Sequence, residues 1–109
     1  PIREFLYVKD AAQIIVDAIQ FKHDLEPINI SGDEISIKNL INLICDIVDY
    51  NPSLVKWDKS KPNGTMRKVL DSKKLSKILP SFKRKDFTSG LKQTIKWYID
   101  NKKEADQRT

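Results

Sequence analysis

The segment from Trp57 to Asp71 constrains the fold most, because it lacks the apolar repeat that would bury it as a helix or a strand. Pro62 interrupts regular structure, and Asn63–Gly64 is a turn dipeptide that tolerates positive φ angles. The segment therefore predicts an exposed turn with basic side chains at Lys59, Lys61, Arg67 and Lys68. Such side chains donate charge-assisted hydrogen bonds to phosphate, but a lysine-rich chain also carries ordinary solvated loops. Both interpretations are open on these residues alone.

Patterned segments flank this turn on both sides. Before it, apolar periodicity predicts strands at 4–8, 28–31 and 53–58, and helices at 10–21 and 37–50. After it, a short helix is expected up to Pro80, followed by a last helix that carries Leu91, Ile95 and Ile99. The expected helix caps are Asp10 with Gln13, Ser36, Asp71 or Ser72, and Asp86 or Thr88. This alternation predicts a small α/β layer of mainly parallel strands with covering helices.

Composition is typical of a folded, soluble domain. Hydrophobic residues make up 39% of the chain and charged residues 32%. No apolar run approaches the ~20 residues that span a bilayer, and no secretory signal is present. Cys45 is the single cysteine, which excludes an internal disulfide, and His23 has no second ligand at metal spacing. We therefore expect a cytoplasmic, metal-free protein with Cys45 in or beside the core and His23 in an exposed linker.

The net charge of +5 permits an acidic partner such as nucleic acid. The basic residues are dispersed from Arg3 to Arg108, however, and no zinc-finger, RNA-binding or basic-heptad pattern occurs. Trp97 and Tyr98 fall within an apolar stripe, which predicts packing rather than base stacking. The chain also lacks a G-x-G-x-x-G turn, a P-loop and any Ser/His/Asp or Cys/His set, so no catalytic residue is expected in it.

Three segments together resemble a known family. Residues 3–12 (REFLYVKDAA), 28–40 (with INISG and ISIKNL) and 58–71 look like the C-terminal part of the extended short-chain dehydrogenase/reductases, the NAD-dependent epimerase/dehydratase family of nucleotide sugars. The segment DKSKPNGTMRKVLD at 58–71 is most similar to D-x-S-K-P-D-G-T-P-R-K-L-L-D of the GDP-sugar epimerase/reductase branch, which acts on GDP-4-keto-6-deoxymannose. The resemblance extends to about Lys102, which leaves 103–109 as a polar tail.

This resemblance implies that residues 1–102 form a nucleotide-sugar substrate-binding lobe. Arg3 and Lys68 match the positions that contact the substrate diphosphate in that branch, and Lys61 and Arg67 are further substrate-binding candidates. Asn63 stands where the branch has an acidic residue that contacts the nucleoside. An amide keeps an acceptor oxygen but loses the charge and gains a donor, so the nucleotide is open among GDP, UDP and dTDP.

The resemblance also implies what lies outside this segment. The Gly-rich turn and the Tyr-x-x-x-Lys pair are expected upstream, in a Rossmann domain that binds NADP(H) or NAD(H). The full-length protein would then be a homodimeric enzyme for a nucleoside-diphosphate sugar, and this fragment alone would be inactive. Two alternatives remain, namely a non-catalytic nucleotide-binding module and, more distantly, a basic domain associated with nucleic acid.

Overall fold

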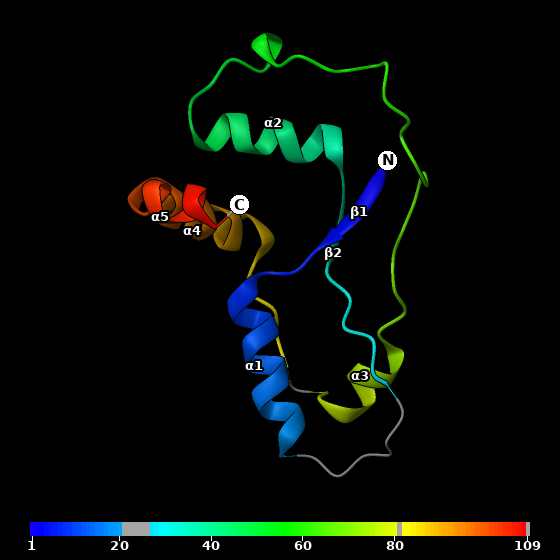
Figure 1. Cartoon of the computed structure of the whole chain (residues 1–109). Helices are drawn as coiled ribbons and strands as arrows, with labels where there is room; N and C mark the ends of the chain where they lie inside the picture. Colours follow the sequence, from blue (N-terminus) through cyan, green and yellow to red (C-terminus); the bar gives the residue numbers. More distant parts are fainter. Residues whose placement is uncertain (21–26, 81, 109) are drawn as a thin grey trace.

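A computed structural model describes residues 1–20, 27–80 and 82–108 of the chain (Figure 1). The elements are β1 (Ile2–Phe5), α1 (Val8–Ile19), β2 (Asp33–Ser36), α2 (Ile37–Ile47), a 3₁₀ turn η1 (Pro52–Leu54), α3 (Lys73–Ile78), α4 (Phe87–Asp100) and α5 (Lys102–Gln107). The expected end of the first helix at Phe21 and the expected exposed position of His23 lie outside the described residues. None of the described helices is long and apolar enough to cross a membrane.

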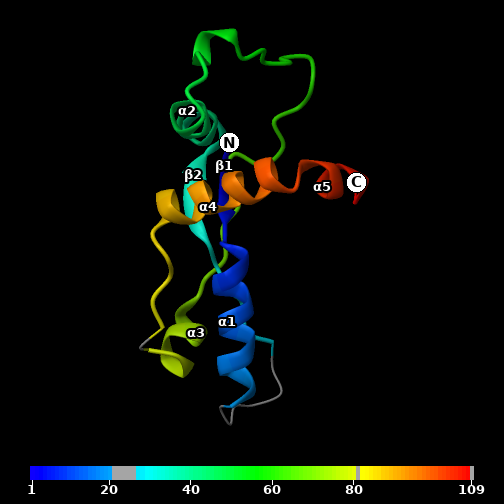
Figure 2. The same ribbon diagram turned by 90° about the vertical axis from the view of Figure 1, so that its left-hand side faces the viewer.

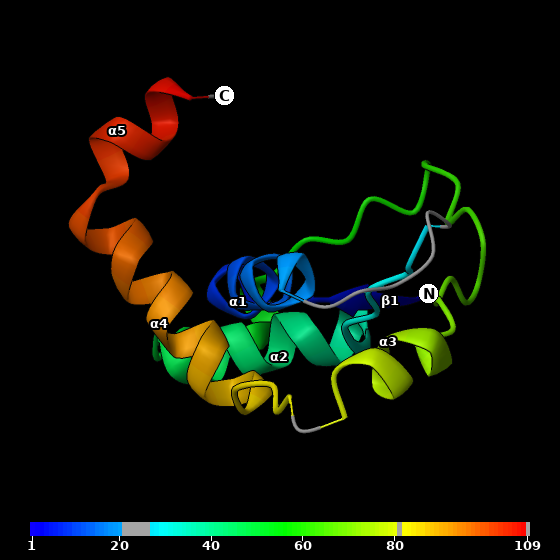
Figure 3. The same ribbon diagram turned by 90° about the horizontal axis from the view of Figure 1, so that it is seen from below.

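The molecule is elongated and open. Its axes measure 50 × 33 × 25 Å, and its radius of gyration of 16.7 Å exceeds the ~13 Å typical of a compact domain near 100 residues. α2 lies at one end, α1 and α3 lie side by side at the other, and β1 and β2 connect the two ends (Figures 1 and 2). α4 begins against the rest of the molecule, where the Tyr7 hydroxyl donates to Gln93 at 2.6 Å, and its later turns and α5 lead away from it (Figure 3). Few side chains are therefore fully buried.

The two strands form an antiparallel sheet, in which Ile2 pairs with Ser36 and Phe5 with Asp33. The α/β class is confirmed, but the mainly parallel layer is not observed among the described residues. The strand expected at 28–31 is also wrong, because Ile28 and Ile30 pack against the core and the pairing begins only at Asp33. β1 leads directly into α1. The chain then returns to the sheet as β2, which runs beside β1 in the opposite direction (Figure 1).

The buried apolar cluster lies between α1 and α3. Ile14, at 1% exposure, contacts Leu75 and Leu79, and partly buried side chains pack around them: Ile28, Ile30, Ile78 and Phe82. The short helix α3 follows Ser72, as expected, and the Asp71 carboxylate accepts a hydrogen bond from the Lys73 amide at 2.9 Å. Because this cluster is small, each of its members contributes a large share of the hydrophobic stabilisation.

Helix α2 begins where it was expected, after Ser36, and it ends before the expected Tyr50. The Ser36 hydroxyl accepts a hydrogen bond from the Asn39 amide at 3.1 Å, which makes it the N-cap. At the other end Asp49 has a φ of 56°, and the Tyr50 amide donates to the Cys45 carbonyl at 2.8 Å. This is a Schellman ending, which satisfies the last carbonyls of the helix. Cys45 is buried, as its place beside the apolar stripe indicates.

Three other expectations about local structure need correction. Helix α1 begins at Val8 rather than Asp10, and the Asp10 carboxylate instead accepts a hydrogen bond from the Lys85 amide at 2.9 Å. The strand expected at 53–58 is wrong, because Asn51 caps the 3₁₀ turn that begins at Pro52. The expected polar tail at 103–109 is largely helical, since α5 spans Lys102–Gln107.

The helix α4 begins at the expected cap, where the Asp86 carboxylate accepts a hydrogen bond from the Ser89 amide at 3.1 Å. Trp97 and Tyr98, which were expected to pack rather than to stack on bases, are 44% and 43% exposed and lie outside the core. They contact α5 instead. Tyr98 donates a hydrogen bond to Asp106 at 2.9 Å, and the Arg108 guanidinium lies 5.8 Å from the Trp97 ring centroid. These contacts join α5 to α4.

Truncating Ile14 tests the small core. We expect Ile14→Ala to lower the free energy of unfolding by about 2–5 kcal/mol, because it removes buried methyl groups and leaves a cavity. Ile19→Ala on the same helix is the matched control, since Ile19 is 79% exposed and its truncation should change stability by less than about 0.5 kcal/mol. Urea unfolding followed by circular dichroism measures both. Equal effects of the two substitutions would contradict this core.

Candidate functional site

Strand β1 is hydrogen-bonded along both of its edges. On one edge it pairs with β2, and on the other it meets the end of the basic segment 58–71. The Ile2 amide donates to the Met66 carbonyl at 2.7 Å, and the Lys68 amide donates to the Ile2 carbonyl at 3.2 Å. Arg67 lies between these two bonds and forms a parallel bridge with Ile2. The pairing places Arg3 and Lys68, which are far apart in sequence, on adjacent backbone segments.

Arg3 holds the turn of the basic segment. Its Nη1 atom donates to the Thr65 carbonyl at 2.6 Å and to its neighbour Ile2 at 2.8 Å. Gly64 has a φ of 71° and lies beside the guanidinium, since a Cβ atom there would sit 3.5 Å from Arg3 Nη2. Among the described residues, Nη2 and Nε of Arg3 make no further hydrogen bond. Arg3 therefore combines a structural contact with N–H groups that are available to a ligand.

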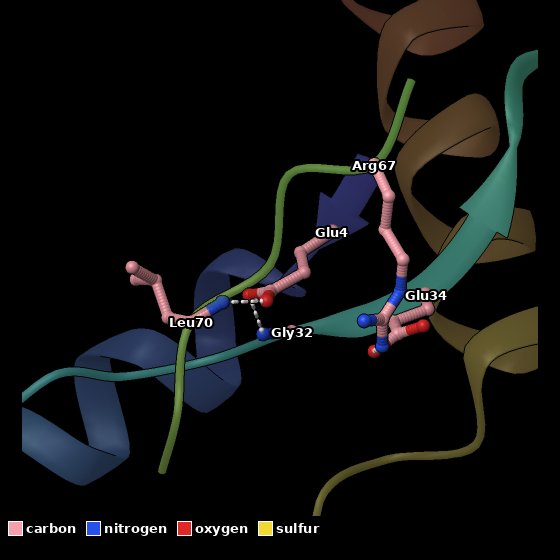
Figure 4. Close-up of polar contacts among 5 residues, drawn as sticks. All are labelled: Glu4, Gly32, Glu34, Arg67 and Leu70. Atoms are coloured by element: carbon pink, nitrogen blue, oxygen red, sulfur yellow. Dashed lines mark hydrogen bonds and ion pairs between the residues drawn. The ribbon is translucent and has the colours of Figure 1, made fainter. Parts of the chain in front are cut away.

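The other four expected site residues behave differently from one another. Arg67 Nη2 forms an ion pair with Glu34 Oε1 on β2 at 2.7 Å, so its charge is already compensated (Figure 4). Lys68 is fixed through its backbone, and its exposed side chain has no ion pair within the described part of the chain. Asn63 is exposed and precedes the glycine that touches Arg3. Lys61 is exposed as well, and no hydrogen bond or ion pair joins it to the other four among the described residues.

Asp58 opens the basic segment with a local turn. The hydroxyl and the backbone amide of Ser60 both donate to the Asp58 carboxylate, and these two bonds hold the pKa of Asp58 below its usual value. The carboxylate is therefore occupied by its own turn. It shapes the start of the loop and leaves the lysines Lys59 and Lys61 in solvent.

Glu4 is a further functional candidate, and its role is visible only in the folded chain. Its Oε2 atom accepts a hydrogen bond from the Gly32 amide at 2.9 Å, and its Oε1 atom accepts one from the Leu70 amide (Figure 4). One side chain on β1 thus connects the approach to β2 with the end of the basic segment. Both partners are backbone amides of residues distant in sequence, so no pattern of residue types could have indicated them.

The electrostatics of this region favour an anion. Lys68 and Arg3 offer donors to solvent beside β1, whereas Glu4 and Glu34 have their carboxylates directed at protein donors. Phosphate oxygens are the matching acceptors for ammonium and guanidinium groups. Within the described residues, no group of three or more His, Cys, Asp and Glu side chains could hold a metal ion.

Gly32 and Gly64 are required for different reasons, the first for lack of space and the second for its backbone φ angle, and alanine substitutions distinguish the two. A Cβ atom at Gly32 would lie 2.4 Å from the Phe5 carbonyl oxygen, so Gly32→Ala should force β2 away from β1 and cost about 1–3 kcal/mol. Gly64→Ala should cost about 1–2 kcal/mol through its positive φ alone. Amide hydrogen exchange in β1 should rise far more for Gly32→Ala. Equal protection of β1 in both variants would refute the close approach.

No family model matches the chain, but curated proteins do. A protein of Oryza sativa subsp. japonica, named probable GDP-L-fucose synthase 1, is 41% identical over 103 residues, which are 93% of this chain and 30% of that protein. GDP-L-fucose synthase 1 of Arabidopsis thaliana is 40% identical over 93% of the chain and 31% of that protein.

GDP-L-fucose synthase of Escherichia coli is 32% identical over 93% of the chain and 34% of that protein. The chain thus spans about a third of the length of the curated relatives that it matches. These names confirm the resemblance to nucleotide-sugar epimerase/reductases, and within them to the GDP-sugar branch that segment 58–71 indicated.

Proposed function

We propose that this chain is the nucleotide-sugar-binding lobe of a GDP-L-fucose synthase-like epimerase/reductase. One observation carries the proposal. The backbone pairing of Ile2 with residues 66–68 places Arg3 and Lys68, the two residues that the resemblance assigns to the diphosphate, on adjacent backbone segments. The names of the relatives support a GDP-linked sugar as the ligand.

The proposed contacts divide among the basic side chains. Lys68 and the unused N–H groups of Arg3 would donate to the diphosphate oxygens, where charge-assisted bonds are strongest. Arg67 would take a smaller part, because Glu34 already compensates its charge. Lys61 would add long-range attraction from the exposed turn rather than a fixed contact.

Asn63 would face the nucleoside. Its amide offers one acceptor and one donor to a base or ribose edge, in place of the charged acceptor that the branch usually has. We therefore expect GDP to bind best and UDP and dTDP to bind measurably, because a neutral amide discriminates less strongly between base edges than a carboxylate does.

The reaction itself would take place outside this lobe. The three glycines of the chain, Gly32, Gly64 and Gly90, stand singly, so its residues do not fit a nicotinamide dinucleotide. The proposal assigns NADP(H) or NAD(H), and the parallel Rossmann layer that holds it, to a part of the protein other than this segment, and a homodimer to the full-length enzyme. The lobe would contribute binding energy from the remote nucleotide, which positions the sugar for reaction.

Titration calorimetry of the chain with GDP, UDP and dTDP tests this function. Lys68→Ala should weaken GDP binding at least about tenfold, because it removes a charge-assisted contact of about 1.5–3 kcal/mol. Arg3→Ala should weaken it further, since it also releases the turn at Thr65. Lys92→Ala, an exposed lysine of α4, is the matched control and should leave the affinity unchanged.

Titration of the chain with single-stranded DNA at two salt concentrations tests the alternative that the protein binds nucleic acid. Tighter binding to DNA than to any nucleoside diphosphate, with a steep salt dependence, would replace the proposed function by nucleic-acid association. Equal loss of GDP affinity in Lys68→Ala and Lys92→Ala would show that only net charge matters.

A further inference from the structure

We propose that Glu4 is a positioning residue for the phosphate-binding segment, acting through two backbone amides and not through contact with the ligand. The inference rests on the proposed function for its effect on nucleotide binding. Its structural part, that Glu4 fixes residues 68–70 against β1, stands on geometry alone.

The geometry makes Glu4 a bridge between three segments. It lies on β1, next to Arg3, and its two carboxylate oxygens accept from different amides, Gly32 N before β2 and Leu70 N after Lys68 (Figure 4). The stretch from Lys68 to Leu70 is therefore attached at both ends, through the Lys68 amide to the Ile2 carbonyl and through the Leu70 amide to the Glu4 carboxylate. A segment held at both ends presents its side chain in a narrower range of positions than one held at one end.

The remaining restraints on this segment do not replace Glu4. The ion pair between Arg67 and Glu34 is more than 40% exposed on both sides, and exposed pairs of this kind are weak. The backbone bonds of Ile2 involve Met66 and Lys68 and stop there, and the next described helix begins only at Lys73. Between these points, Glu4 supplies the contact that fixes Leu70.

The role requires a carboxylate rather than any polar side chain. Both oxygens act as acceptors at the same time, and both partners are donors. A glutamine of the same length keeps one oxygen and turns an N–H group toward the second amide, so it can satisfy only one of the two. An aspartate keeps both acceptors on a shorter stem. The predicted order of function is therefore glutamate, then aspartate, then glutamine.

The test compares Glu4→Gln and Glu4→Asp with the matched control Glu104→Gln, which removes an exposed carboxylate of α5 that pairs with Arg108, outside the proposed site. Amide hydrogen exchange at Leu70 and Gly32 measures the fixation, and GDP titration measures its consequence. Urea titration identifies conditions under which every variant is fully folded, and the GDP titrations are carried out under those conditions. A variant that is only less stable then keeps its affinity for GDP.

We expect Glu4→Gln to accelerate exchange at Leu70 or Gly32 at least about tenfold and to weaken GDP binding by a similar factor. Glu4→Asp should recover part of both effects, and Glu104→Gln should leave both close to the wild-type values. Unchanged exchange at Leu70 and Gly32 in Glu4→Gln, or in Glu4→Asp if the glutamine variant does not fold, would overturn the inference.

The two proposals can fail separately. If the unmodified chain does not bind GDP, the proposed function fails, and the exchange data still decide whether Glu4 fixes the segment. If the chain binds GDP and Glu4→Gln binds it equally well, the positioning role fails and the proposed function stands.

Discussion

The hydrogen bonding of β1 on both edges is the constraint on which the rest of the structure depends. Ile2 directs its backbone groups to Met66 and Lys68, while the strand pairs with β2 on the other edge. Without this arrangement the basic segment 58–71 would have no fixed place, because it contains no helix or strand of its own among the described residues. The side chains of Arg3 and Glu4 reinforce the same junction from within β1.

The apolar core alone could not impose this order. Its cluster of Ile14, Leu75 and Leu79 lies between α1 and α3, at the end of the molecule away from α2. Polar contacts instead organise the middle of the structure, including the carboxylates of Glu4 and Asp10 on backbone amides. Such contacts contribute modestly to stability but fix geometry closely, which is what a binding site requires.

Local signals in the sequence predicted the helices well. Ser36 and Asp86 act as N-caps because their side chains need only the amides three residues later. The strands were predicted poorly, because pairing depends on partners far away in sequence: Ile28 and Ile30 read as a strand and instead fill the core. The site followed the same rule. The basic residues of segment 58–71 were candidates by type and Arg3 by the resemblance, and their role stays a prediction, whereas no sequence pattern indicated Glu4 before its distant backbone partners were placed.

The central claim is that a nucleoside diphosphate binds where segment 66–68 meets β1. Mapping amide chemical-shift changes in the chain during titration with GDP tests it most directly. The account predicts that the changes concentrate at residues 2–4 and 63–70 and saturate together. Changes spread over the lysines of α4 and α5, or confined to α1 and α3, would contradict it.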